Sequence, residues 1–125
     1  MRTSRLQGIL WHQGESDCYT DESILRHKEM FLTMITTLRR DLDAEDLPLL
    51  IGELSEHMDP TRGFVDRPAR MNLQYQELAK ELPHCRVVSA KNLTMKADGI
   101  HFDARSLRVF GVRYFEEYRK AVEEA

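Results

Sequence analysis

Pro48-Leu49-Leu50-Ile51-Gly52-Glu53-Leu54 (residues 48–54) is a short apolar run that a proline introduces and a glycine ends. Runs of this length with such boundaries are typical of β-strands. Residues 6–11 and 85–89 have the same character. The sequence therefore predicts three short strands, and the first of them, over 6–11, is expected to be buried.

Amphipathic helices are predicted after each of these strands. Apolar side chains recur at helical spacing over residues 21–42, over 68–82 and from about Asp103 onward. Thr20 or Asp21 is a suitable cap for the first helix. In the last helix, the side chains expected to pack on the sheet are Leu107, Phe110, and Tyr114 or Phe115.

The order of these elements is strand, helix, strand, helix, strand, helix. Such alternation predicts an α/β fold in which right-handed crossovers build a parallel sheet with helices on its faces. Ligands of open parallel sheets bind beyond the carboxyl ends of the strands. Three loops are expected at that edge: residues 12–17, 53–67 and 91–101.

The amino-acid composition favours some classes of protein and excludes others. The 125 residues are 42% hydrophobic and 31% charged, which fits one globular domain spanning residues 1–125. Eighteen Lys and Arg face 21 Asp and Glu in interspersed order, for a net charge of −3, so we expect no nucleic-acid partner and no membrane partner. No signal peptide is recognisable in this chain, which makes the cytoplasm the default expectation. Cys18 and Cys85 lack CxxC spacing and are expected to be reduced.

Asp98-Gly99-Ile100-His101 is the sharpest local signal. A histidine that acts as a general base needs a carboxylate to fix its tautomer and stabilise its cation. A carboxylate three residues earlier, across a turn that contains glycine, can reach the inner ring nitrogen and leave the outer one facing the cleft. The competing interpretation is structural, with Asp98 as a turn residue and His101 at a helix entry.

The loop after the first strand, His12-Gln13-Gly14-Glu15-Ser16-Asp17, is the second signal. Gln13 and Gly14 could offer a side-chain amide and a backbone N–H to a developing oxyanion, and Glu15 adds a carboxylate. The alternative is a polar turn without a catalytic role. Ser16 lies in no GxSxG sequence, so it is not predicted to be a nucleophile.

No metal or other cofactor is predicted. The residues from which a metal site could be built are His12, Glu15, His57, Asp59 and His101. None of them shows HExxH spacing or another recognised ligand interval.

The combination of WHQGESD after the first strand, GEL after the second, and DGIHF before the last helix resembles the sialate O-acetylesterase-like branch of the SGNH hydrolases. That branch includes the acetylxylan esterases of carbohydrate esterase family 6. The resemblance runs from residue 6 to about 120. It implies a three-layer α/β/α, flavodoxin-like fold and a serine esterase that removes acetyl groups from carbohydrates of the sialate or acetylxylan type.

The resemblance also implies roles for individual residues. His101 corresponds to the catalytic base and Asp98 to its usual neighbour, while Gln13 falls at the HQGE glutamine that resembles an oxyanion-hole asparagine. Glu15 matches the HQGE glutamate, so either Glu15 or Asp98 is expected to orient His101. Glu53 matches the GEL signature and is expected to support loops.

The sequence departs from the family pattern in one large respect. The family places its nucleophilic serine in a GQS-type block before HQGE, and no serine of this sequence matches that pattern. The chain therefore resembles the C-terminal part of the hydrolase, with three strands of a sheet that normally has five. It is expected to be a piece of something longer that lacks the N-terminal strands and is inactive alone.

Two other functions compete with the esterase. One is a non-catalytic carbohydrate-binding or regulatory relative that kept the cleft and lost the nucleophile. The other is an assembly subunit, in which an exposed sheet edge at residues 6–11 pairs with another copy to form a homo-oligomer.

Overall fold

The computed structural model describes residues 3–124, and within that range the chain forms one parallel sheet with the strand order β1-β2-β3. The strands are β1 (Ile9–Trp11), β2 (Leu49–Gly52) and β3 (Cys85–Val88). The helices that alternate with them are α1 (Asp21–Asp41), α2 (Arg67–Glu81) and α3 (Ala104–Glu123). Two 3-10 helices, η1 (Glu15–Tyr19) and η2 (Pro60–Arg62), lie in the loops.

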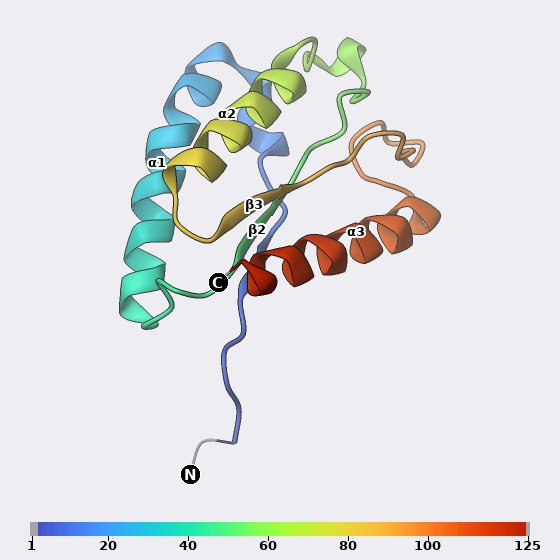
Figure 1. Ribbon diagram of the computed structural model, residues 1–125. Coiled ribbons are helices and arrows are strands. Elements are labelled where there is room, and N and C mark those ends of the chain that lie inside the picture. The colour runs from blue at the N-terminus through green and yellow to red at the C-terminus, as the bar shows by residue number, and fades with distance from the viewer. Residues whose placement is uncertain (1–2, 125) are drawn as a thin grey trace.

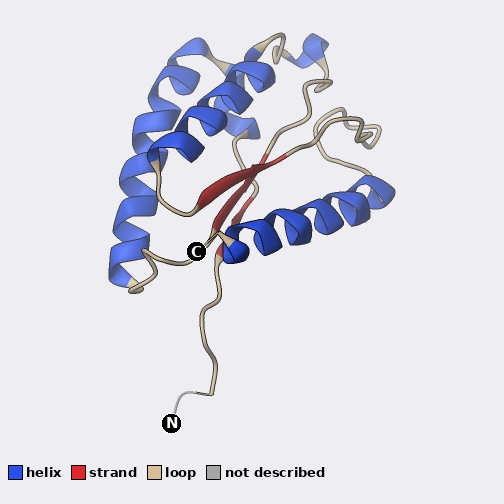
Figure 2. Ribbon diagram, viewed as in Figure 1, coloured by secondary structure: helices blue, strands red, loops and turns tan. Residues whose placement is uncertain are grey.

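The elements form three layers, with α1 and α2 on one face of the sheet and α3 on the other (Figures 1 and 2). Side chains of β2 alternate between the two cores. Leu49 and Ile51 belong to the cluster beneath α1 and α2, whereas Leu50 packs with Phe110 of α3. The predicted three-layer α/β arrangement with a parallel sheet is therefore confirmed.

Two helices begin directly after a capping residue. Thr20 precedes α1, and its hydroxyl oxygen accepts a hydrogen bond from the Ser23 N–H at 3.1 Å. Asp103 precedes α3 and accepts from the Ser106 N–H at 2.8 Å. Each cap satisfies a backbone donor that has no partner inside its helix.

The first strand differs from its prediction in length and in burial. Pairing with β2 begins at Ile9, so residues 6–8 lie outside the strand, and the side chain of Leu10 is 65% exposed. Leu107 of α3 is also exposed, whereas Phe110 is buried and Tyr114 packs against the same cluster, as expected. Phe115, the alternative to Tyr114, is exposed. The reason is shared: an apolar residue is buried only where a neighbouring element covers it, and β1 is the outer strand of the sheet.

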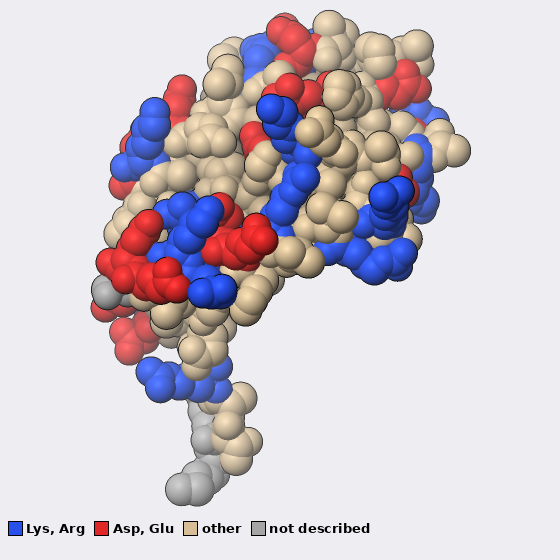
Figure 3. Space-filling view, turned by 45° about the vertical axis from the view of Figure 1, so that its right-hand side comes forward, with Lys and Arg blue, Asp and Glu red and all other residues tan. Residues whose placement is uncertain are grey.

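The surface carries both signs of charge, often side by side (Figure 3). Arg86, for example, contacts Glu117 at 2.6 Å and Glu124 at 2.9 Å. Among the helices described, none combines the length and the apolar character that crossing a membrane requires.

The burial of Phe110 makes it a test of the α3 packing. Its ring meets those of Phe102 and Tyr114 with centroids 5.4 and 5.0 Å apart, and its exposed fraction is 3%. We expect Phe110→Ala to lower the free energy of unfolding by about 3–5 kcal/mol, measured by urea denaturation followed by circular dichroism. Phe115→Ala, on the same helix but 61% exposed, is the control and should cost less than about 1 kcal/mol. Equal losses for the two variants would contradict this packing.

Candidate active site

Two loops that are far apart in the sequence meet at the carboxyl edge of the sheet. The loop that follows β3 returns across the sheet end, so that Phe102 stacks on His12 with ring centroids 5.7 Å apart. Phe110 meets the same histidine ring edge-on at 5.2 Å. The loop after β1 and the Asp98–His101 turn are thereby brought into one neighbourhood.

The Asp98–His101 turn is held by both oxygens of one carboxylate. Asp98 Oδ1 accepts hydrogen bonds from the N–H groups of Ile100 at 2.9 Å and His101 at 3.0 Å. Asp98 Oδ2 lies 2.7 Å from His101 Nδ1. The His101 side chain is 66% exposed, so its second ring nitrogen, Nε2, is free to face a ligand.

The sequence leaves open whether Asp98 or Glu15 contacts the His101 ring, and this geometry distinguishes the two carboxylates. Among residues 3–124, the side chain hydrogen-bonded to the His101 ring is that of Asp98, and Glu15 makes no such bond. The His101 ring holds the pKa of Asp98 well below its ordinary value, and the two backbone N–H donors act in the same direction. Asp98 is therefore a carboxylate across the ordinary pH range, as a residue that orients an imidazole must be.

The turn rests on a residue from another loop. Asp59 donates its backbone N–H to the Gly99 carbonyl at 2.9 Å. Gly99 has φ +70°, and an added Cβ would lie 2.7 Å from Asp59 Cβ, so glycine is required there for both conformation and space. In the sequence, Asp59 was singled out only as a possible metal ligand. Its contact with Gly99 is made by the backbone, so the identity of its side chain does not reveal that contact.

The Gln13-Gly14 peptide is anchored from the core. The Tyr75 hydroxyl donates to the Gln13 carbonyl oxygen, and the Cys18 thiol donates to the Gly14 carbonyl oxygen at 3.4 Å. The described peptide bonds are trans, so the Gly14 N–H points away from Tyr75 and the Glu15 N–H away from Cys18. The Gln13 side chain is exposed. These groups remain candidates for stabilising an oxyanion.

The same loop is fixed to α1 through a second histidine and carboxylate. Asp17 Oδ2 lies 2.7 Å from Nδ1 of His27, which is buried against Phe31 and Tyr75. Neither Tyr75 nor His27 was singled out from the sequence, because both lie on helical stripes whose spacing already explains them as core residues.

Several neighbouring groups shift the pKa of His12. Its pKa is lowered, chiefly because the ring is desolvated against its aromatic neighbours. The negative charge of Glu15 and a hydrogen bond to the Glu53 backbone oppose that shift, while His101 adds to it. Glu15 and His101 therefore both influence the pKa of His12 at this edge.

Glu53 is hydrogen-bonded to the segment that follows β3, as expected from its match to the GEL signature. Its backbone N–H donates to Val88 O at 2.9 Å, and its Oε1 accepts from the Ala90 N–H at 3.1 Å. The adjacent Leu54 backbone is held by Asn72, whose amide both accepts and donates, at 2.8 and 2.9 Å.

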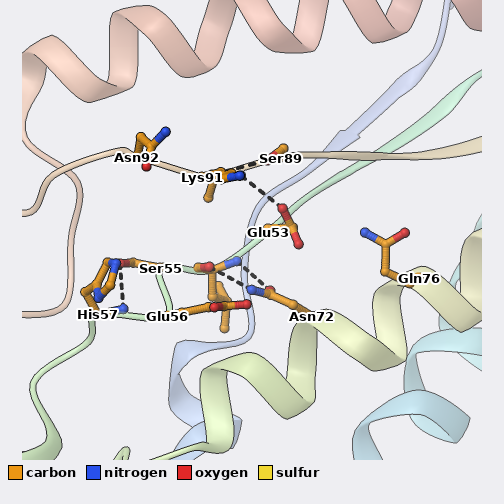
Figure 4. A pocket seen from close by; sticks show the side chains of 11 residues that line it. Glu53, Ser55, Glu56, His57, Asn72, Gln76, Ser89, Lys91 and Asn92 are labelled. Atoms are coloured by element: carbon orange, nitrogen blue, oxygen red, sulfur yellow. Dashed lines mark hydrogen bonds between the residues drawn. The ribbon is translucent and has the colours of Figure 1, made fainter.

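A polar hollow of about 530 Å³ opens beside Glu53, between α2 and the ends of β2 and β3 (Figure 4). Its charged and amide side chains are Glu53, Glu56, Asn72, Gln76, Lys91 and Asn92. Groups of this kind donate and accept hydrogen bonds in the way that sugar hydroxyls require.

Within the described chain, no serine hydroxyl is hydrogen-bonded to a histidine ring. Ser55 is buried and accepts from the His57 N–H at 3.1 Å, and Ser106 accepts from the Thr94 N–H at 2.8 Å. Likewise, no three His, Cys, Asp or Glu side chains of the described residues are grouped so as to hold a metal ion.

The Asp98–His101 contact predicts a specific titration. In carbon-detected NMR, the Asp98 carboxyl should titrate below its ordinary pKa, and His101→Ala should raise that pKa towards about 3.9. Asp103 is an internal control, because Thr94 and the Ser106 N–H lower its pKa and do not change in this variant. Because the pKa of Asp98 is depressed in the folded state, its contribution to stability is present above about pH 4 and is lost as the pH falls further. An unchanged Asp98 titration in His101→Ala would refute the contact.

Gly14 offers a second test, since it has φ +142° and its added Cβ would lie 2.6 Å from the Tyr75 hydroxyl oxygen. Gly63 also has positive φ, at +88°, but nothing lies within 4 Å of its added Cβ. Gly14→Ala should therefore cost more than Gly63→Ala, whose loss should be about 1 kcal/mol from backbone strain alone. In a Tyr75→Phe background that excess should shrink, because the two sites share one contact. Urea denaturation measures all four variants, and an excess that is the same in both backgrounds would contradict the anchoring.

The sequence and the fold are similar to those of known proteins. The family described as "Carbohydrate esterase, sialic acid-specific acetylesterase" matches residues 1–120. A probable carbohydrate esterase of Arabidopsis thaliana, At4g34215, is 24% identical over 113 residues, which cover 90% of this chain and 40% of that protein. The X-ray structure of the Arabidopsis protein superposes with a TM-score of 0.77 and 22% identity, over 93% of this chain and 45% of the other. The chain thus spans less than half the length of this relative.

Proposed function

Because the chain belongs to the sialic acid-specific acetylesterase family of carbohydrate esterases, we propose that its Asp98–His101 pair serves the hydrolysis of O-acetyl esters on carbohydrates, of the sialate or acetylxylan type. The observation that carries this proposal is the 2.7 Å contact between Asp98 Oδ2 and His101 Nδ1, beside an exposed second ring nitrogen. A histidine oriented in this way is suited to move protons between a nucleophile and a leaving group.

The first half of the proposed reaction forms an acyl-enzyme. A serine hydroxyl from polypeptide outside this chain attacks the acetyl carbonyl carbon, and its proton passes to His101 Nε2. The resulting tetrahedral oxyanion accepts hydrogen bonds from the Gly14 N–H and the Gln13 amide. When the C–O bond to the sugar breaks, His101 returns the proton to the departing sugar oxygen.

The second half releases acetate. A water molecule gives a proton to His101 Nε2 and attacks the acyl carbon, and the serine oxygen recovers the proton as its ester bond breaks. Asp98 remains ionised throughout and stabilises the imidazolium that forms in each half. We assign this orienting role to Asp98, and to Glu15 an electrostatic influence on His12. The proposed chemistry is complete with these groups and requires no cofactor.

A second candidate is carbohydrate binding without hydrolysis. It is favoured by the polar hollow beside Glu53 and by the observation that no described serine is hydrogen-bonded to His101. In this case acetylated xylo-oligosaccharides would shift the NMR signals of Gln76 and Asn92, and no acetate would be released.

Ester hydrolysis separates the two candidates. The purified chain should hydrolyse p-nitrophenyl acetate no faster than its His101→Ala variant, because the proposed nucleophile lies elsewhere. Addition of the At4g34215 segment outside the matched region should give turnover that His101→Ala reduces by about 10²- to 10⁴-fold. His84→Ala is the matched control, since His84 lies just before β3, at the opposite end of the strands, and its loss should leave turnover unchanged.

Two results would contradict the esterase. Robust turnover by the chain alone that depends on His101 would show that a nucleophile is already present. The second candidate would be supported instead if the complementary segment binds but acetylated sugars are not hydrolysed, while the chain binds oligosaccharides.

A further inference from the structure

Gly14 carries a backbone donor whose acceptor is not found in the described chain. The residue is buried, yet its N–H makes no hydrogen bond within residues 3–124. Buried backbone N–H groups are almost always paired, so this one is available to a ligand. The other end of the same peptide unit, the Gln13 carbonyl oxygen, is already bound from the core by the Tyr75 hydroxyl.

The Tyr75 hydroxyl acts on this peptide unit as a proton donor. A carbonyl oxygen has no proton to give, so the phenol must direct its own proton at the Gln13 oxygen. Burial raises the pKa of Tyr75. The phenol therefore keeps its proton, and with it the hydrogen bond, across the ordinary pH range.

The ring that carries this hydroxyl is fixed by its neighbours. Tyr75 is 0% exposed and meets the rings of His27 and Phe31 at an angle, with centroids 5.5 and 6.1 Å apart. His27 is itself held by the Asp17 carboxylate of the same loop, at 2.7 Å. The hydroxyl thus has little freedom to turn towards another acceptor, because close-packed rings on both sides hold its direction.

A donor at the carbonyl oxygen strengthens the N–H at the other end of the peptide. Hydrogen bonds in a chain polarise one another, by roughly 10–30% per bond in condensed phases. The Tyr75 O–H, the Gln13 carbonyl and the Gly14 N–H form such a chain across one trans peptide bond. Its effect is larger for an acceptor that carries negative charge than for a neutral ester oxygen.

We propose that Tyr75 is a positioning residue for ester hydrolysis, whose hydroxyl orients and polarises the Gln13-Gly14 peptide so that the Gly14 N–H stabilises the tetrahedral oxyanion more than the bound ester. The inference rests on the proposed function, in which this N–H is an oxyanion donor. Cys18 binds the next carbonyl, that of Gly14, at 3.4 Å, and contributes less because a thiol is a weak donor.

The polarisation is measured by NMR on the chain itself. Tyr75→Phe removes the hydroxyl and keeps the ring, so the Gln13 carbonyl carbon and the Gly14 amide proton should both shift upfield. Tyr75→3-fluorotyrosine, which has a more acidic phenol, should shift both downfield. Tyr118→Phe is the matched control, because the Tyr118 hydroxyl donates to the Gln7 carbonyl oxygen at 3.5 Å, outside this loop.

The effect on the reaction is measured in the mixture of the chain with the unmatched At4g34215 segment. Tyr75→Phe should lower kcat for p-nitrophenyl acetate about 2- to 10-fold and leave KM within about twofold, since the lost stabilisation belongs to the oxyanion. Tyr118→Phe should change neither constant. Circular dichroism melts establish that the variants are folded.

Opposite shifts for the two Tyr75 variants, together with a loss confined to kcat, support the proposal. Unchanged Gln13 and Gly14 signals in Tyr75→Phe would overturn it whatever the turnover, and so would an unchanged kcat or an effect on KM alone. Absence of turnover from the unsubstituted mixture would contradict the proposed function, and the NMR shifts would still decide whether Tyr75 polarises the peptide.

Discussion

The position of the candidate site depends on one side chain that crosses the sheet. Tyr114 of α3 reaches over Gly52 and donates its hydroxyl to the Trp11 carbonyl oxygen at 2.6 Å. A Cβ at Gly52 would lie 2.1 Å from the Tyr114 oxygen, so the crossing exists only because β2 ends on a residue without a side chain. This bond ties α3 to the end of β1. Because the Asp98–His101 turn directly precedes α3, it also decides where His101 lies relative to the loop that follows β1.

The loops of the site are otherwise held by neutral groups that the core positions. Tyr75 and Cys18 bind carbonyls of the Gln13-Gly14 segment, and Asn72 binds both polar groups of the Leu54 backbone. Each of these donors or acceptors lies on an element packed in the core or directly against it. A loop fixed in this way loses little further freedom when a ligand binds, which is what preorganisation of a reacting site requires.

Local patterns in the sequence predicted much of this arrangement. Alternating strands and helices predicted the parallel sheet, and the candidate cap at Thr20 or Asp21 predicted where α1 starts. The Asp98-Gly99-Ile100-His101 turn was also predictable, because the three hydrogen bonds of the Asp98 carboxylate form within four residues. In the caps and the turn, the partners of each interaction are close in the sequence. The pairing of the strands, such as Ile9 with Leu49, follows instead from the order of the elements.

The features that escaped prediction depend on distant partners. That Asp98 rather than Glu15 is hydrogen-bonded to the His101 ring follows from the path of the chain after β3, which composition does not specify. Leu10, Leu107 and Phe115 occupy apolar positions of well-formed elements, yet they are exposed because no element of the described residues covers them. Periodicity identifies which face of an element is apolar, whereas burial depends on what lies opposite.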